Sequence, residues 1–376
     1  MGVFYVYSAL EFDMTTLNPL ENLDPARFDT PRILKKLASA SRRLAELKGV
    51  AATIPNQGVL INTLGLQEAK DSSEIENIVT THDELFKGDD PAQDAIDAAT
   101  KEVLRYRHAL RRGFNLVKET GLLTLNHILQ VQEVLEQNRA GFRKLPGTAL
   151  KNSAGEVVYT PPQDQQEVQR LMGDLEKFIN GDVPFEVDPL IKMSLIHHQF
   201  ESIHPFYDGN GRTGRIVNVL YLVKEDLLDI PVLYLSSRIV QTKAEYYRLL
   251  QAGREEDAWE DWVFYMLDMV EHTAAKTIQT IGAIKNVLQD YKHRIRAKHK
   301  GFYSQDLINN LFTHPYTRIE YLMQDLNVSR TTATSYLDRL AEDGFLVKQK
   351  RGRGNYYINI ALTAILMGRS AEGTAE

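Results

Sequence analysis

Two side chains four residues apart, His204 and Asp208, are of types that carry out catalysis in proteins. Histidine is the side chain whose ordinary pKa lies nearest neutrality, so His204 is a candidate general base. Asp208 offers a carboxylate, which suits a hard cation such as Mg²⁺. A base and a metal ligand this close together indicate a catalytic site.

The residues that follow predict an anion-binding turn. Gly209, Asn210 and Gly211 allow backbone N–H groups to converge on an anion, because glycine tolerates positive φ angles and close approach. The helix expected to follow, as far as about residue 224, points its positive end at the same anion. Arg212 and Arg215 lie three apart on one helical face, where each can bind phosphate oxygens. A glycine-rich turn that merely caps a helix requires neither base nor arginines, so residues 204–215 predict a site for a nucleotide polyphosphate.

Residues 204–215 resemble the Fic family signature, His-Pro-Phe-x-Asp/Glu-Gly-Asn-Gly-Arg-x-x-Arg, and match it at every fixed position. Most Fic proteins use Mg²⁺ to transfer AMP from ATP onto a hydroxyl of a target protein, releasing pyrophosphate. The resemblance implies that His204 deprotonates a Ser, Thr or Tyr hydroxyl, on a target or on the protein itself, and that Asp208 holds the metal. The implied nucleotide-binding residues of this segment are Gly209, Asn210, Gly211, Arg212, Thr213, Gly214 and Arg215.

Three alternatives stay open at this point. A transcriptional regulator could use the same fold as a nucleotide sensor, although a sensor has no use for the general base His204. Some relatives remove AMP at the same site. Other nucleotides or phosphocholine diesters are also candidate donors, because the signature contacts phosphates and not the base.

An upstream segment, residues 71–77, predicts an inhibitory helix. In isolation, Ser73 and Glu76 form a helix-capping pattern. The family's inhibitory helix carries Ser/Thr-x-x-x-Glu-Gly/Asn, which Ser72, Glu76 and Asn77 match. Ser72 and Glu76 share one helical face, so the resemblance implies that Glu76 pairs with Arg215 and holds ATP in an unproductive pose.

A short β-hairpin is expected at residues 145–162, between helices. Turn residues precede Val157, Val158 and Tyr159, and two prolines follow them. The segment resembles the family's flap, which aligns the target chain by β-augmentation and covers the nucleotide, with these three residues on the nucleotide side. By the same resemblance, Tyr246 is an adenine-side aromatic; a core tyrosine on an amphipathic helix is the alternative.

The C-terminal region, residues 291–367, resembles a winged helix-turn-helix. Residues 291–360 hold twelve Lys and Arg against six Asp and Glu, a net charge of +6, whereas the whole chain carries −6. Such a basic module favours a polyanionic partner. The candidate DNA contacts are Arg330, Thr331, Thr332, Arg351 and Arg353. Docking of a protein is the alternative, because winged helices serve both roles.

The predicted fold is mainly α: a Fic-type helical bundle with a β-hairpin flap, followed by a small α+β winged-helix domain. The 376 residues divide into an N-terminal helical region (1–110), a catalytic core (111–290), the C-terminal domain (291–367) and a disordered tail (368–376). The absence of cysteine excludes disulfides, thiolate metal sites and a cysteine nucleophile, and favours a cytoplasmic location. No apolar stretch is long enough to span a membrane. A homodimer is implied by the family alone.

Overall fold

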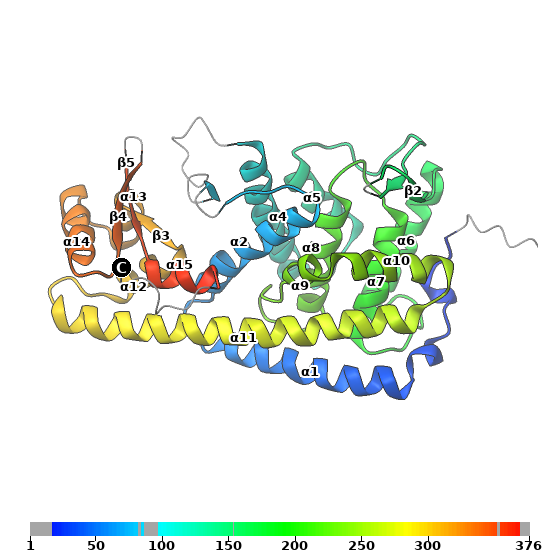
Figure 1. Cartoon of the computed structure of the whole chain (residues 1–376), viewed down its shortest axis with the longest axis horizontal. Coiled ribbons are helices and arrows are strands. Elements are labelled where there is room, and N and C mark those ends of the chain that lie inside the picture. Colours follow the sequence, from blue (N-terminus) through cyan, green and yellow to red (C-terminus); the bar gives the residue numbers. More distant parts are fainter. Residues whose placement is uncertain (1–16, 82–83, 86–96, 153, 352–353, 369–376) are drawn as a thin grey trace, which may run out of the picture.

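The computed structural model describes residues 17–81, 84–85, 97–152, 154–351 and 354–368. The described chain is mainly helical, with two small antiparallel sheets, which confirms the predicted fold class (Figure 1). Two short 3₁₀ helices, η1 (Leu20–Asn22) and η2 (Pro25–Phe28), precede the first long helix. The helices of the bundle are α1 (Pro31–Ala52), α2 (Gln57–Ile75), α4 (Ala98–Thr120), α5 (Leu125–Glu136), α6 (Gln165–Asn180), α7 (Pro189–Ile203), α8 (Asn210–Lys224), α9 (Ser236–Gln241), α10 (Lys243–Glu255) and α11 (Trp259–Lys298).

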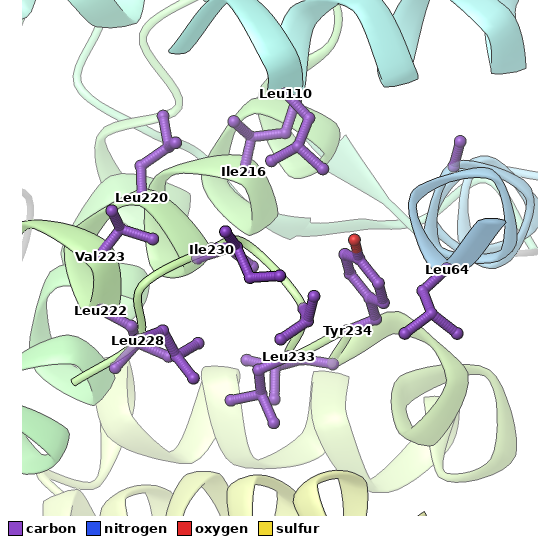
Figure 2. Packing of buried hydrophobic residues seen from close by; sticks show 14 of the residues in the cluster. Leu64, Leu110, Ile216, Leu220, Leu222, Val223, Leu228, Ile230, Leu233 and Tyr234 are labelled. Carbon is purple, nitrogen blue, oxygen red and sulfur yellow. The ribbon is translucent and has the colours of Figure 1, made fainter. Parts of the chain in front are cut away.

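Helices α7 and α8 form the centre of the bundle and flank the signature turn. Every residue of α7 from Leu190 to Ile203 is buried, as expected for a helix surrounded by others. Figure 2 shows the apolar packing around α8, where Leu220 and Val223 lie near the segment that carries Ile230. Dense packing of this kind resists displacement, so the turn between the two helices has a rigid support.

Helix α11 connects the bundle to the C-terminal domain without a break (Figure 1). Its first half packs along α1, where Lys36 pairs with Asp268 at 2.6 Å and Glu271 at 2.9 Å. Its last turns pack on the C-terminal domain, where the Tyr291 hydroxyl donates to the Phe345 carbonyl at 2.8 Å. The boundary expected near residue 290 therefore lies inside a continuous helix.

The predicted flap is a two-stranded hairpin of β1 (Leu150–Lys151) and β2 (Val157–Tyr159). Leu150 pairs with Tyr159 and Lys151 with Val157, and a bulge interrupts the register between them. The β2 strand of the hairpin contacts α10, because the Gln251 side chain of α10 donates to the Val158 carbonyl at 2.8 Å.

The C-terminal region, which was predicted to be a winged helix, contains a three-stranded antiparallel sheet and short helices. Its sheet has the order β3-β5-β4, and the helix pair α13–α14 packs beside it. These elements are α12 (Gln305–Thr313), β3 (Tyr316–Arg318), α13 (Ile319–Leu326), α14 (Arg330–Glu342), β4 (Val347–Arg351), β5 (Gly354–Ile358) and α15 (Ile360–Leu366). The wing tip, with the predicted contact Arg353, lies outside the described residues, as does the tail from residue 369, and Arg351 is the last residue of β4. Within the described ranges, no helix is both long and apolar enough to cross a bilayer.

Candidate active site

The signature turn is held in shape by one buried side chain. Helix α7 ends at Ile203, the next residue His204 adopts a left-handed conformation (φ 49°), and α8 begins at Asn210. The Asn210 amide accepts from the Phe206 N–H at 2.8 Å and donates to the Phe206 carbonyl at 2.9 Å. Asn210 is 3% exposed, so these bonds are shielded from water. In this structure Asn210 shapes the turn that was predicted to contact phosphate.

Two glycines let carboxylate groups approach the turn closely, because neither glycine has a Cβ. Gly209 has φ 76°, and a Cβ there would lie 2.3 Å from Glu136 Oε1. A Cβ at Gly211 would lie 2.3 Å from Glu76 Oε1. The Glu76 carboxylate therefore lies directly over the first turn of α8, where the helix N-terminus favours negative charge.

The turn forms one wall of a cavity of about 380 Å³. Residues of the predicted inhibitory segment and of α4 form other parts of the wall, so the predicted base His204, the predicted metal ligand Asp208 and Glu76 share one space. Its lining residues are Glu76, Ile78, Glu102, His204, Tyr207, Asp208, Gly209, Asn210, Gly211 and Arg212. Thr213 and Gly214, also predicted for the nucleotide, are absent from this lining: Thr213 is buried and Gly214 faces Phe200 and Glu201 of α7.

His204 has the protonation state that a general base needs. Burial lowers its pKa to about 4, the positive charges of Arg254 and Arg143 add to this effect, and Glu76 opposes it. The imidazole is therefore neutral at physiological pH and can accept a proton. Its Nδ1 atom is buried without a hydrogen-bond partner in the described part of the chain.

Arg212 is surrounded by carboxylates that the sequence pattern did not reveal. Its guanidinium lies 2.9 Å from Glu102 of α4 and 3.0 Å from Glu136 of α5. Asp208 follows at 3.8 Å, and the Arg212 side chain is only 3% exposed. Burial, its largest influence, raises the pKa of Glu136, while Arg212 acts in the opposite direction. These ion pairs orient Arg212 at the cavity wall.

Asp208 is the best-placed ligand for a metal. Its side chain is 78% exposed, and one oxygen accepts from the Gly209 N–H at 2.7 Å. Among the residues that the structure describes, no cluster of three or more His, Asp or Glu could hold a metal by itself. Mg²⁺ commonly takes only one or two protein carboxylates and completes its shell with water and substrate phosphates. An exposed carboxylate beside an anion-binding turn fits that donor set.

The structure brings the predicted inhibitory residues to Arg215. The Arg215 guanidinium donates to the Ser72 hydroxyl at 2.8 Å, to the Ser72 carbonyl at 2.9 Å and to Glu76 Oε1 at 2.9 Å. Burial acts to raise the pKa of Glu76, but the charge and hydrogen bond of Arg215 outweigh it, so the pKa is lowered and Glu76 is ionised. The Arg215 side chain is 2% exposed, so the pair is protected from solvent on its cationic side.

Asn77 explains why the inhibitory pattern ends in Gly or Asn. It follows the end of α2 with φ 62°, a left-handed conformation that these two residues tolerate best. This geometry turns the chain back, and the Ile78 N–H closes the turn on the Ser73 carbonyl at 2.9 Å. Lys243 of α10 also holds this end, because its ammonium donates to the Ile75 carbonyl at 2.6 Å.

Two buried carboxyl groups near Arg215 were not anticipated from the sequence. Glu68 accepts from the Tyr106 hydroxyl at 3.0 Å and from Ser236, and burial raises its pKa to about 7. Burial likewise raises the pKa of Glu201 to about 7, and its Oε1 has no hydrogen-bond partner among the described residues. No spacing rule identifies such groups, because their environment comes from helices far apart in the chain.

Both valines of the flap strand are exposed, and its last residue, Tyr159, contacts the end of α7. Val157 and Val158 are 56% and 43% exposed. The Tyr159 hydroxyl donates to the Ser202 carbonyl at 2.9 Å, and the Arg254 guanidinium lies 4.0 Å from the centre of the Tyr159 ring. The flap is thus fastened to the end of α7.

The structure places Tyr246 in the core. It is 1% exposed, and its hydroxyl lies 2.9 Å from Nε2 of His197. This is the alternative considered for Tyr246, and its predicted contact with adenine remains untested. Its neighbour Tyr247 is the exposed ring of the pair, at 46%.

Three family profiles match this chain, and together they cover most of it. Residues 34–115 match the "Fic/DOC family N-terminal" profile and residues 122–222 the "Fic/DOC family" profile. Residues 287–362 match "Protein adenylyltransferase SoFic-like, C-terminal domain". The bundle, its signature turn and these matches define one class of protein. The chain belongs to the Fic/DOC family.

Similar proteins agree with this assignment. "Protein adenylyltransferase fic-1" is 27% identical over 168 residues in Caenorhabditis briggsae and 27% identical over 164 residues in Caenorhabditis elegans. These alignments cover 43% and 42% of this chain but only 30% of each relative. A crystal structure of a Fic family protein from Desulfovibrio desulfuricans G20 has a TM-score of 0.57 and 20% identity, covering 92% of this chain and 98% of the other. At that identity the likeness concerns the fold alone.

Proposed function

We propose that this protein is a Mg²⁺-dependent protein adenylyltransferase that uses ATP and is inhibited by its own Glu76. The observation that supports the proposal most strongly is the shared cavity, which is lined by His204, whose imidazole is neutral, and by the first residues of α8. The carboxylate of Glu76 already occupies the place where an anion would bind. Relatives named protein adenylyltransferase support the same reaction.

In the proposed reaction, the target hydroxyl loses its proton to His204 and its oxygen attacks the α-phosphorus of ATP. The bond between the α-phosphorus and the bridging oxygen to the β-phosphate breaks, and pyrophosphate leaves with the electron pair. The start of α8 would stabilise the α-phosphate, because the first N–H groups of a helix have no intrahelical partner and Gly211 and Arg212 line the cavity. Asp208 would hold Mg²⁺, which neutralises phosphate charge when bound.

The same geometry supports inhibition by Glu76. A phosphate and a carboxylate would compete for one helix N-terminus and one guanidinium; Glu76 bonds to the Arg215 guanidinium and lies against Gly211 in the first turn of α8. ATP that binds while Glu76 remains in place cannot use Arg215 for its terminal phosphates. Release of the end of α2 would free both binding groups at once.

Binding of duplex DNA by the C-terminal domain remains a prediction, as do the homodimer and the cytoplasmic location. Arg330 of α14 pairs with Glu320 at 2.9 Å, and Lys348 pairs with Asp338 at 2.7 Å. These internal pairs neutralise part of the basic surface. Affinity for duplex DNA, measured at two salt concentrations, distinguishes a DNA partner from a protein partner, because binding to phosphates weakens steeply with salt. Absence of salt-sensitive binding at low ionic strength would favour a protein partner.

Transfer of label from ATP tests the proposed reaction. ATP labelled at the α-phosphate should label the protein or proteins of a lysate, whereas ATP labelled at the γ-phosphate should not. His204→Ala should abolish labelling, while the control His272→Ala, an exposed residue on α11, should not. ATP binding without transfer by the Glu76→Gly variant, in which the proposed inhibition is removed, would favour a sensor, and transfer of the γ-label would contradict adenylylation.

A further inference from the structure

The last carbonyl groups of α7 are capped by residues of the flap region. A helix leaves its final carbonyls without intrahelical partners. Here the Ser202 carbonyl accepts from Tyr159 of β2 at 2.9 Å. The Ile203 and His204 carbonyls accept from the Arg143 guanidinium at 3.2 and 2.9 Å. Every one of these bonds ties the catalytic turn to the segment that carries the flap.

Arg143 bonds both to the signature turn and to the chain just beyond β2. Its backbone N–H donates to the Pro205 carbonyl at 2.8 Å, and its guanidinium also donates to the Pro162 carbonyl, just beyond β2. The residue is 1% exposed, although arginine is rarely buried. A planar guanidinium can reach three carbonyls in fixed directions, which a lysine ammonium cannot reproduce.

The two residues after Arg143 strengthen the same connection. The backbone N–H groups of Lys144 and Leu145 donate to the Tyr207 hydroxyl at 2.8 and 3.2 Å. Tyr207 lies inside the signature turn, three residues after His204, and lines the cavity. The segment 143–145 is therefore bonded to the turn on both sides of Phe206.

We propose that Arg143 is a positioning residue that fixes the flap to the catalytic turn and so sets where a target hydroxyl meets the His204 imidazole. This inference rests on the proposed transferase function. A target chain that pairs with β2 takes its position from the flap, and the imidazole takes its position from the end of α7. Arg143 donates to the carbonyl of His204 and to the carbonyl of Pro162, which lies just beyond β2. It therefore fixes the flap relative to His204.

The charge of Arg143 supplies a readout that a purely structural residue would lack. The charged groups that act on His204 are Arg143 before the flap, Arg254 on α10 and Glu76 after α2. The Glu201 carboxyl of α7 is buried nearby and carries little charge below its pKa of about 7. Loss of one cation from this set makes the imidazole easier to protonate.

The test compares Arg143→Lys and Arg143→Gln in a Glu76→Gly background, where transfer is measurable. Both should lower kcat about 100-fold, because small misplacement of reacting groups costs about that much. KM for ATP should change less than about threefold, because nucleotide contacts are retained. The acid limb of the pH–rate profile should move to higher pH in Arg143→Gln only, since lysine keeps the charge. Arg139→Gln is the control, because Arg139 is 85% exposed and pairs only with Glu133 among the described side chains.

Full kcat in Arg143→Lys would overturn the inference, and so would an equal fall of kcat in the Arg139 control. If Arg143→Gln does not fold, the kcat of Arg143→Lys alone tests the inference, which expects the same fall of kcat in that variant. Failure of the Glu76→Gly parent to transfer AMP would contradict the proposed function instead. In that event, hydrogen exchange still tests, without turnover, whether Arg143 holds the flap: exchange of the amides of residues 150–152 and 154–159 should rise at least about tenfold in Arg143→Lys. Unchanged exchange would show that Arg143 does not hold the flap.

Discussion

Replacement of Glu76 by glycine removes the carboxylate that lies over α8 and leaves the rest of the inhibitory segment in place. Arg215 would keep its two bonds to Ser72, at 2.8 and 2.9 Å, and lose only the 2.9 Å bond to Glu76. The cavity would also gain space above Gly211, which the carboxylate now fills. The substitution should therefore raise transferase activity without disturbing the catalytic turn.

The size of the effect follows from the strength of that single bond. A hydrogen bond between charged groups contributes about 1.5–3 kcal/mol in proteins. The Glu76 side chain is 34% exposed, so solvent weakens the pair and the lower part of the range applies. About 2 kcal/mol corresponds to about a 30-fold change in the population that binds ATP productively. The initial rate of AMP transfer should rise by about that factor.

The assay is the initial rate of incorporation of α-labelled AMP at saturating Mg²⁺ and limiting ATP. Glu76→Gln should activate almost as well as Glu76→Gly, because loss of the negative charge is the cause. Glu74→Gln is the matched control, since Glu74 pairs with Lys70 at 3.1 Å and lies outside the lining of the cavity. A rate that is unchanged or lower in both Glu76 variants would refute the inhibitory role.

Three further predictions concern the framework of the site. Asn210→Ala should lower the free energy of unfolding by about 2–4 kcal/mol in denaturant titration, because two backbone groups of Phe206 lose their buried partner; an unchanged midpoint would contradict this. For Glu201, burial raises the pKa from 4.5 to about 7, so its favourable contribution is complete below about pH 4.5 and is lost as the pH rises through 7. Glu201→Gln should flatten stability over that range and stabilise the protein at pH 8, and an identical slope in urea unfolding from pH 5 to 8 would count against the buried carboxyl. Lys243→Ala should raise AMP transfer a few-fold, less than Glu76→Gly, because it frees the Ile75 carbonyl at the end of α2 but leaves the Arg215 pair intact; a lower rate would show that Lys243 does not stabilise the inhibited state.

The sequence could predict the relative positions of those candidate residues that are close together in the chain. A turn followed by a helix places His204, Asp208 and Arg212 by backbone geometry alone, and the structure brings all three to one cavity. The pairing of Glu76 with Arg215 crosses 139 residues, and only the family pattern pointed to it. The spacing of residues within one helix predicts which residues share a face of that helix, but it does not predict which residue of another helix pairs with them.

The parts that the sequence did not reveal are those that tertiary packing creates. Arg143 shows no periodic or motif signal, and its role comes from carbonyls that lie about 20 and 60 residues away. Tyr246 and Tyr247 are adjacent on α10, and only the rotation of that helix against α7 decides which ring is buried. The acidity of Glu201 depends in the same way on burial, which no single-sequence pattern specifies.

The most direct test of the proposed site is a crystal structure of the Glu76→Gly variant with ATP and Mg²⁺. The α-phosphate should lie over the first turn of α8, with the metal at Asp208 and the terminal phosphates near Arg215. The His204 imidazole should stand open to the cavity, on the side of the α-phosphorus opposite the departing pyrophosphate. An empty turn at saturating ATP, or a nucleotide bound with its phosphates away from Gly211, would contradict the account.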